Sequence, residues 1–386
     1  MKSVKETSFL SKNECQAMKG LAILSIVLHN LCHVMPLARG TNEFFYKQQY
    51  TDNLWDYARH MDSNWFMVLG SFFGQFGVQV FLFLSAYGLV LKYEKGNGAD
   101  TGRWSFIGHH YLKLFRLMII GLITAIFLGE MVKHNAGDAF LTSMGLGGLK
   151  MHFMSHPEYW FPQVFMITNL LPRPDINIYP GPFWFLGLMV EVYAIYRLFL
   201  YAPRHCAAWR KWLPPVIFVL GTWIPQLVWG PTGDVITYLR YNFLIAGVPF
   251  AAGLLTARFV KLPQVGKPGL LLLAAVATAA FVAMQYNYNL WLWCSLFFIM
   301  AVAATVRLCG EKLMKPMVWV GMISSALFIV HPIVRIFFFT WDWWPATSQH
   351  LYSVLAIYVA VSLLAAVAYR RLITILPSPR QVTRYK

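Results

Sequence analysis

Long apolar stretches separated by shorter polar ones follow each other along the whole chain. Ten of them have about the 20 residues that an α-helix needs to cross the hydrocarbon core of a bilayer. They are residues 17–37, 70–92, 108–131, 181–202, 212–230, 238–257, 268–286, 288–309, 316–339 and 350–373. The pattern predicts an all-α polytopic membrane protein with ten transmembrane helices. We expect one integral membrane domain, residues 1–386, made of an N-terminal segment 1–16, a helical core 17–373 and a basic tail 374–386.

The segment 132–180 fits this pattern less well. Its apolar part, Tyr159 to Leu171, is short and contains Pro162, which has no backbone N–H to donate. Irregular backbone at membrane depth is tolerated only where protein or water covers it. We therefore expect a re-entrant or interfacial segment here.

The composition agrees with a membrane protein. Hydrophobic residues make up 58% of the chain and charged residues only 12%, about half the charged fraction of a soluble domain. The five cysteines show no CxxC spacing, so neither a disulfide framework nor a cysteine metal site is expected.

The net charge of +16 follows from the predicted topology. If the N-terminus is cytoplasmic, most of the 32 Lys and Arg residues fall on the cytoplasmic side, as the positive-inside rule requires. Both termini are then cytoplasmic. Because this distribution explains the charge, a nucleic-acid partner is not expected.

The first predicted helix carries two histidines in an otherwise aliphatic run. Ser25, His29 and His33 follow each other at intervals of four residues and share one helix face. His29 lies ten residues beyond Lys19, about 15 Å along the helix axis, near the middle of the bilayer. Ionisable groups at this depth are candidates for function. Two alternatives are a neutral histidine that bonds a neighbouring helix and a zinc pair with His331 as a third ligand; we expect no metal.

Four stretches, in order, resemble motifs of the acyltransferase family 3 membrane proteins. MKGLAILSIVLHN (Met18 to Asn30) resembles the family's first helix, in which a basic residue and Gly-hydrophobic-Ala precede a histidine. FGQFGVQVFLFLSAYGLVLKY (Phe73 to Tyr93) resembles its G-V-x-x-F-F-x-L-S-G-Y helix. GPFWFLGLMVEVYAIY (Gly181 to Tyr196) resembles W-F-L-x-x-E-x-x-x-Y, and SSALFIVHPIV (Ser324 to Val334) resembles S-x-x-x-Y-x-x-H. These stretches span most of the chain.

The chain departs from the family pattern at three positions. Lys19 replaces the usual arginine, and Ala86 stands where the family commonly has glycine. The family's histidine, eleven residues after the basic residue, would fall on Asn30, whereas His29 lies one residue earlier. A shift of one residue turns a side chain by about 100° around the helix. We expect His29, in preference to His33, to be the catalytic histidine.

The resemblance implies a membrane-bound O-acyltransferase of a bacterial envelope. Its co-substrate would be acyl-coenzyme A, with acetyl the usual group and acetyl-CoA the usual donor. Its acceptor would be a hydroxyl group of a glycan or glycolipid, reached across the cytoplasmic membrane. Expected partners are therefore acyl-CoA, the glycan acceptor and membrane lipids, and a homo-oligomer is left open. Whether the histidine acts as a base or carries the acyl group is also left open.

Other polar residues inside the predicted helices receive roles from the same resemblance. Glu191 is the acid/base partner or orienting group for the histidine, with a structural hydrogen bond between helices as the alternative. Further candidates lie along the substrate path or at the oxyanion: Asn30, Ser85, Tyr87, Trp184, Tyr193, His331 and Arg335. For His331 a structural role is equally open.

Basic residues lie where the predicted first and third helices meet the cytoplasm. Lys113 and Arg116 are three residues apart and share a face. Together with Lys19 they are candidates to bind the phosphates of coenzyme A by charge-assisted hydrogen bonds. The alternative is ordinary snorkelling of long basic side chains to lipid headgroups.

Two other functions fit some of these features. A secondary transporter could use the intramembrane histidine and Glu191 for proton coupling, although no internal repeat of the kind found in many transporters is evident. A non-catalytic relative that keeps the fold is the other. The Trp-rich segment WDWWP, Trp341 to Pro345, is expected at the outer surface as part of an interfacial belt.

Overall fold

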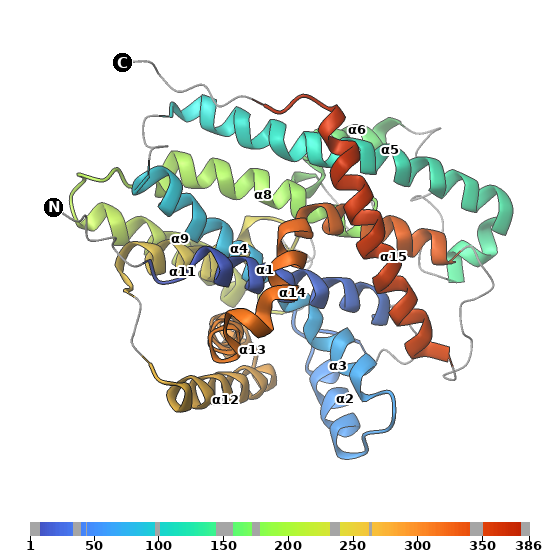
Figure 1. Cartoon of the computed structure of the whole chain (residues 1–386), viewed down its shortest axis with the longest axis horizontal. Coiled ribbons are helices and arrows are strands. Elements are labelled where there is room, and N and C mark those ends of the chain that lie inside the picture. Colours follow the sequence, from blue (N-terminus) through green and yellow to red (C-terminus); the bar gives the residue numbers. More distant parts are fainter. Residues whose placement is uncertain are drawn as a thin grey trace.

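The computed structural model describes residues 8–33, 40–43, 45–96, 101–143, 157–171, 178–231, 240–261, 265–339 and 350–379. Their regular structure is helical (Figure 1). The α-helices are α1 (Lys12–Cys32), α2 (Gln48–Arg59), α3 (Trp65–Phe73), α4 (Gly77–Leu89), α5 (Arg103–Ser143), α6 (Pro157–Val164), α8 (Trp184–Ile195), α9 (Trp209–Trp229), α11 (Gly247–Phe259), α12 (Lys267–Ala283), α13 (Tyr288–Trp291), α14 (Cys294–Phe339) and α15 (Leu351–Leu372). Short 3₁₀ and π turns extend them: η1 (Gly74–Phe76), η2 (Val90–Glu94), η4 (Thr168–Leu170), η5 (Gly181–Phe183), η6 (Tyr196–Leu200), η7 (Phe243–Ala246), η8 (Met284–Tyr286) and η10 (Ile373–Ile375).

Within the described residues, eight helices are long and apolar enough to cross a membrane. The predicted number of ten differs from this for two reasons. The helices predicted at 288–309 and 316–339 are two helical segments that meet at a kink at Gly310, where the backbone is not helical, and they count once because both belong to α14. The helix predicted at 238–257 corresponds to Phe243–Phe259, which is shorter than a full span. The orientation of the termini remains a prediction.

Helix boundaries differ from the prediction where polar side chains cap the helix. The first helix begins at Lys12 and not at 17, because Ser11 and Glu14 form a reciprocal capping box at its N-terminus. It ends at Cys32, so His29 lies in its last turn. The segment Tyr159 to Leu171 forms the end of α6 and the turn η4, both too short to cross a bilayer. The WDWWP segment lies outside the described residues.

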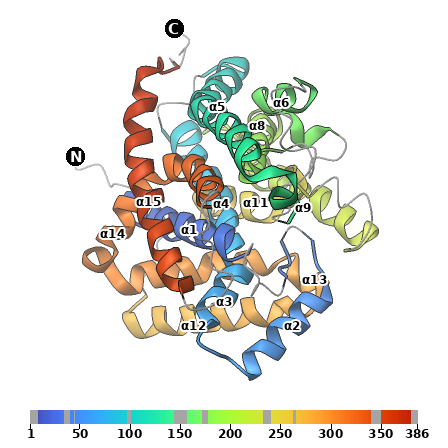
Figure 2. The same ribbon diagram turned by 90° about the vertical axis from the view of Figure 1, so that its right-hand side faces the viewer.

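Helix α1 lies in the middle of the molecule, against α14, α4, α3 and α15 (Figures 1 and 2). Its crossing with α14 brings the two backbones into contact at two points. A Cβ atom on Gly20 would lie 2.0 Å from the carbonyl oxygen of Met317, and one on Gly321 would lie 1.9 Å from that of Gln16. Only glycine fits at such points, and small residues of this kind allow close helix packing in membranes.

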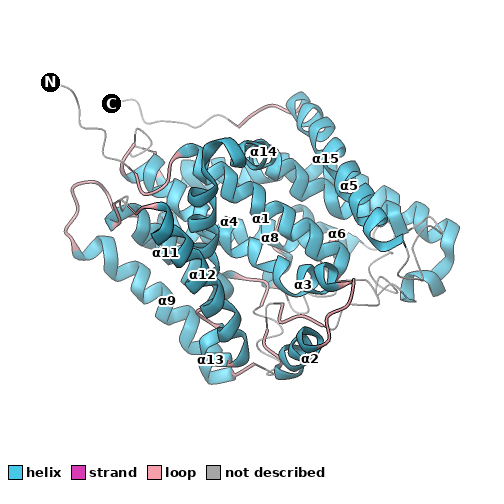
Figure 3. Ribbon diagram, turned by 60° about the horizontal axis from the view of Figure 1, so that its bottom comes forward, coloured by secondary structure: helices cyan, strands magenta, loops and turns pink. Residues whose placement is uncertain are grey.

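A buried ion pair ties three chain segments together at the ends of η2, η6 and α11. Arg258 donates to both carboxylate oxygens of Glu94, at 2.8 and 2.6 Å, and both side chains are at most 5% exposed. The hydroxyl of Tyr196 donates to the same carboxylate at 3.1 Å. The third nitrogen of Arg258 donates to the carbonyl of Lys211 at 2.6 Å, so the guanidinium joins α9 to this corner. In the view of Figure 3, α9 and α11 lie side by side.

We expect Glu94→Gln to lower the free energy of unfolding by about 3 kcal/mol, because removal of one partner leaves the other charge buried and unpaired. Thermal unfolding of the purified protein in detergent measures this. The matched control is Arg59→Met, which breaks the exposed pair of Arg59 with Asp56 and should change the stability by less than about 1 kcal/mol. An equal, small effect of both substitutions would contradict the expectation.

Candidate active site

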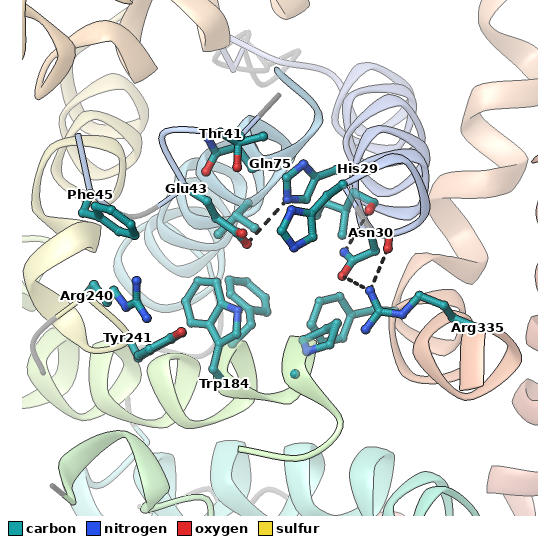
Figure 4. A pocket seen from close by; sticks show the side chains of 18 of the residues that line it. His29, Asn30, Thr41, Glu43, Phe45, Gln75, Trp184, Arg240, Tyr241 and Arg335 are labelled. Atoms are coloured by element: carbon teal, nitrogen blue, oxygen red, sulfur yellow. Dashed lines mark hydrogen bonds and ion pairs between the residues drawn. The ribbon is translucent and has the colours of Figure 1, made fainter. Parts of the chain in front are cut away.

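A cavity of about 460 Å³ lies at the C-terminal end of α1, and we call it the histidine cavity (Figure 4). Its walls come from the last turns of α1, the segment 40–50, η1, the start of α8, residues 240–241 and α14. The polar side chains that line it include His29, Asn30, His33, Glu43, Arg240 and Arg335. The chain therefore gathers both helix-1 histidines, two arginines and a carboxylate around one space.

His29 is held by groups on both sides of its ring. The side chain is 3% exposed, and its Nδ1 lies 2.6 Å from the carbonyl oxygen of Ser71, at the end of α3. Because a carbonyl only accepts, Nδ1 must carry the proton in this contact. Nε2 then faces the carboxylate of Glu43, with 3.5 Å between Nε2 and Oε1. The ring is oriented by the backbone and presents its other nitrogen to the cavity side.

Glu43 supplies the negative charge of the cavity. Burial raises the pKa of its carboxyl group, but the positive charge and the hydrogen bond that a protonated His29 supplies outweigh that effect, with His33 and Arg240 adding to it. The net result lowers the pKa of Glu43 to about 2. The carboxylate is therefore ionised at neutral pH and is placed to stabilise a positive charge on His29.

His33 caps the end of α1 and stacks on His29. The two ring centroids are 5.4 Å apart with an angle of 14° between the planes. Burial lowers the pKa of His33, and the neighbouring His29 and Arg335 add to this, against the opposing effect of Glu43. His33 is therefore neutral at neutral pH and lies one turn beyond the better-oriented ring of His29.

Two arginines face the cavity from opposite sides (Figure 4). Arg335 donates to the carbonyl oxygen of Asn30 at 2.6 Å, which satisfies an acceptor at the end of α1. Arg240 lies over the rings of Phe45 and Tyr241, 5.0 and 4.8 Å from their centroids. Each guanidinium also has a buried Nε that makes no hydrogen bond within the described residues.

A second cavity of about 440 Å³ lies beside the N-terminal half of α1, and we call it the basic cavity. Five residues predicted from the sequence line it: Lys19, Ser85, Lys113, Arg116 and Tyr193. Arg116 is already engaged, since its guanidinium donates to the carbonyls of Ile373 and Leu376 at 2.8 and 3.0 Å. The two lysines remain as the cations that a ligand in this cavity would meet first.

Five predicted residues thus reach the histidine cavity and five reach the basic cavity. The first group is His29, His33, Asn30, Trp184 and Arg335. Three predicted residues line neither cavity: Glu191, Tyr87 and His331.

The three residues outside the cavities bond to backbone groups. Glu191 accepts a hydrogen bond from the N–H of Phe243 at 2.8 Å, where η7 begins. The N–H of Leu10 donates to the hydroxyl of Tyr87 at 2.8 Å, which fixes the segment before α1. The Nδ1 of His331 lies 3.0 Å from the carbonyl oxygen of Leu327, one turn earlier in α14. The structure therefore brings Glu43, and not Glu191, to His29.

The sequence offered little to identify Glu43, Arg240 or Ser71. Glu43 follows α1 in an irregular segment without periodicity, and Arg240 lies before η7, where a helix was predicted. That helix begins later because the side chain of Asn242 and the carboxylate of Glu191 accept the first free N–H groups. Within the described residues, no three His, Cys, Asp or Glu side chains are close enough together to bind a metal ion.

The histidine cavity has the parts needed for general base catalysis. A hydroxyl group placed in it could give its proton to Nε2 of His29, while the ionised Glu43 stabilises the imidazolium that forms. The arginines are placed to stabilise negative charge that develops near the ring.

Comparisons with known proteins add a family. A family model described as an acyltransferase domain matches residues 13–371, which is essentially the whole chain. Neither the curated proteins nor the solved structures contain a match.

Proposed function

This chain belongs to acyltransferase family 3, and from that membership and its two cavities we propose that it transfers an acyl group, most simply acetyl, from acyl-CoA to a hydroxyl group of an envelope glycan or glycolipid. It is an acyltransferase and an integral membrane protein. The donor, the acceptor and a location in the bacterial cytoplasmic membrane are parts of the proposal.

The observation that carries the proposal is the position of His29 between the Ser71 carbonyl and the Glu43 carboxylate in a cavity open to a substrate. In the proposed reaction, the acceptor hydroxyl gives its proton to Nε2, and its oxygen attacks the acyl carbon. The carbon–sulfur bond of the thioester then breaks. The imidazolium returns its proton to the leaving thiolate, which gives free coenzyme A and an ester.

The basic cavity supports the choice of donor. The phosphates of coenzyme A need cations, and Lys19 and Lys113 line this cavity while Arg116 is engaged with backbone carbonyls. Along α1, Lys19 is separated from His29 by about 15 Å, so a donor bound at the lysines would extend its thioester toward the histidine. The positive-inside pattern expects the lysine end to face the cytoplasm, where acyl-CoA is found.

The test uses everted membrane vesicles from bacteria that express the chain, supplied with radiolabelled acetyl-CoA. We expect label in the glycan fraction that mild base releases, as it does O-esters. The double variant Lys19→Gln/Lys113→Gln should raise the KM for acetyl-CoA about tenfold or more, since a hydrogen bond to a charged group contributes roughly 1.5–3 kcal/mol.

Lys312→Gln/Lys315→Gln is the matched control for this test. It removes the same charge from exposed positions outside the basic cavity and should leave the KM unchanged. Absence of base-labile label with the wild-type chain would contradict the proposed function. An equal rise in KM for both double variants would contradict the role given to the basic cavity.

A further inference from the structure

The histidine cavity and the basic cavity meet at two aromatic side chains. Phe185, from α8, and Phe328, from α14, are the residues that line both cavities. Their ring centroids are 5.4 Å apart, with 56° between the planes, and the residues are only 9% and 7% exposed. The two spaces therefore share a wall made of two packed phenyl rings.

Each ring of this wall has aromatic support. Phe185 contacts Phe81 of the basic cavity, at 6.3 Å between centroids, and Trp184 of the histidine cavity, at 5.9 Å. Phe328 packs against the ring of His331, at 5.8 Å. These edge-on and tilted contacts hold the rings in place without hydrogen bonds, so a ring can turn aside without breaking a polar contact.

We propose that Phe185 and Phe328 form a gate between the acyl donor and the acceptor, and that this gate limits the size of the acyl group and keeps water from the thioester. The inference rests on the proposed function, because it assumes a thioester in the basic cavity and an acceptor in the histidine cavity. On the direct path from the basic cavity to the histidine cavity, an acyl group passes between these rings. A short group requires a small displacement of the rings, and each further methylene requires a larger one.

The low exposure of the Phe185 and Phe328 side chains has a chemical consequence, because these rings keep water away from the thioester. The polar groups of the histidine cavity would admit water beside His29, and water activated by that ring attacks the same acyl carbon as the acceptor does. The water oxygen would form the new bond, the carbon–sulfur bond would break, and free acid and coenzyme A would leave. Two phenyl rings between the cavities suppress this side reaction until an acceptor is bound.

The test measures release of free coenzyme A by purified protein in detergent, with no acceptor present and with acetyl-CoA or hexanoyl-CoA as donor. Phe185→Ala and Phe328→Ala should each raise acceptor-independent hydrolysis about tenfold. They should also raise the hexanoyl-to-acetyl rate ratio about tenfold, the scale on which an apolar site discriminates between chains that differ by methylene groups.

Phe298→Ala is the matched control. It removes a phenyl ring of the same size from α14, where Phe298 packs against Phe76 and Phe281. Phe298 lines neither cavity, so this variant leaves the wall between them closed. Its hydrolysis rate and chain-length ratio should remain those of the wild type. Phe185→Leu and Phe328→Leu keep most of the bulk and should give intermediate values; they also decide the question if either alanine variant fails to fold in a thermal unfolding control.

The outcomes separate the gate from the function on which it rests. If the wild-type protein neither binds labelled acetyl-CoA on a filter nor releases coenzyme A, the proposed function fails. If the wild-type protein is active and the gate variants keep its hydrolysis rate and chain-length ratio, the gate is overturned. The same changes in Phe298→Ala would also overturn it, because they would report a general loosening of the helices and not an opening of this wall.

Discussion

His29→Ala is expected to lower the rate of acyl transfer about 10²–10⁴-fold, the contribution of a positioned general base. The buried ring has one nitrogen fixed by the Ser71 carbonyl and the other directed toward Glu43, so no other side chain of the cavity is equally prepared to take the acceptor proton. The vesicle assay with labelled acetyl-CoA measures the loss, normalised to the amount of protein in the membrane.

His33→Ala is the control for this substitution. It removes an equal ring from the next turn of α1, and we expect a loss of at most about tenfold, because His33 lacks the backbone contact that orients His29. Full activity of His29→Ala, or a greater loss for His33→Ala, would show that His29 is not the catalytic base.

The same two variants distinguish the two routes of transfer. Purified protein is incubated with labelled acetyl-CoA alone and separated on a denaturing gel. Label that stays on the wild-type chain and disappears in His29→Ala would show an acyl-histidine. Bound donor without covalent label would show direct transfer to the acceptor.

Glu43→Gln is expected to lower kcat about 10²-fold with little change in the KM for the donor. The amide keeps the shape of the side chain but cannot neutralise the imidazolium that forms when His29 takes a proton. In serine proteases a carboxylate that bonds the opposite nitrogen, Nδ1, contributes about 10⁴-fold. The smaller figure here reflects the 3.5 Å separation and the independent hold of Ser71 on the ring.

The difference in stability between wild type and Glu43→Gln should depend on pH in a defined direction. The pKa of Glu43 is lowered from 4.5 to about 2, so its interactions stabilise the folded protein above pH 4.5 and are lost as the pH falls from there toward 2. Wild type should therefore unfold at a higher temperature than Glu43→Gln at pH 7, and the difference should shrink below pH 4.5.

For the effect on kcat, Glu191→Gln serves as the comparison with Glu43→Gln. Glu191 lies outside both cavities, so this substitution should leave kcat much less affected. The reverse order of the two kcat values would restore Glu191 as the partner of His29.

Much of the fold could be predicted from the sequence, because long apolar helices can be identified from their composition alone. Their rotation about the axis could not, because helices that are apolar on most faces leave no polar side to mark the surface. Glu191 was expected from its depth and from the family resemblance to partner His29, whereas its carboxylate bonds the N–H of Phe243.

The candidate site could be predicted from the sequence only in part. His29, Asn30 and His33 belong to one helix whose spacing is visible in the sequence. Glu43 and Arg240 reach the same cavity from irregular segments, and only the folded backbone brings them there. The aromatic wall could not be foreseen either, since Phe185 and Phe328 are two of 30 phenylalanines in the chain.

The contact of Gly20 with Met317 has a consequence for the length of the donor. Because the backbones of α1 and α14 touch there and again at Gly321, neither helix can slide along the other without a steric clash. Lys19 and His29 both lie on α1, whose position is fixed by these contacts. The distance between the lysine that binds the charged end of the donor and the reacting ring is therefore fixed at about 15 Å. A donor whose arm is shorter than this distance cannot contact Lys19 and His29 at the same time.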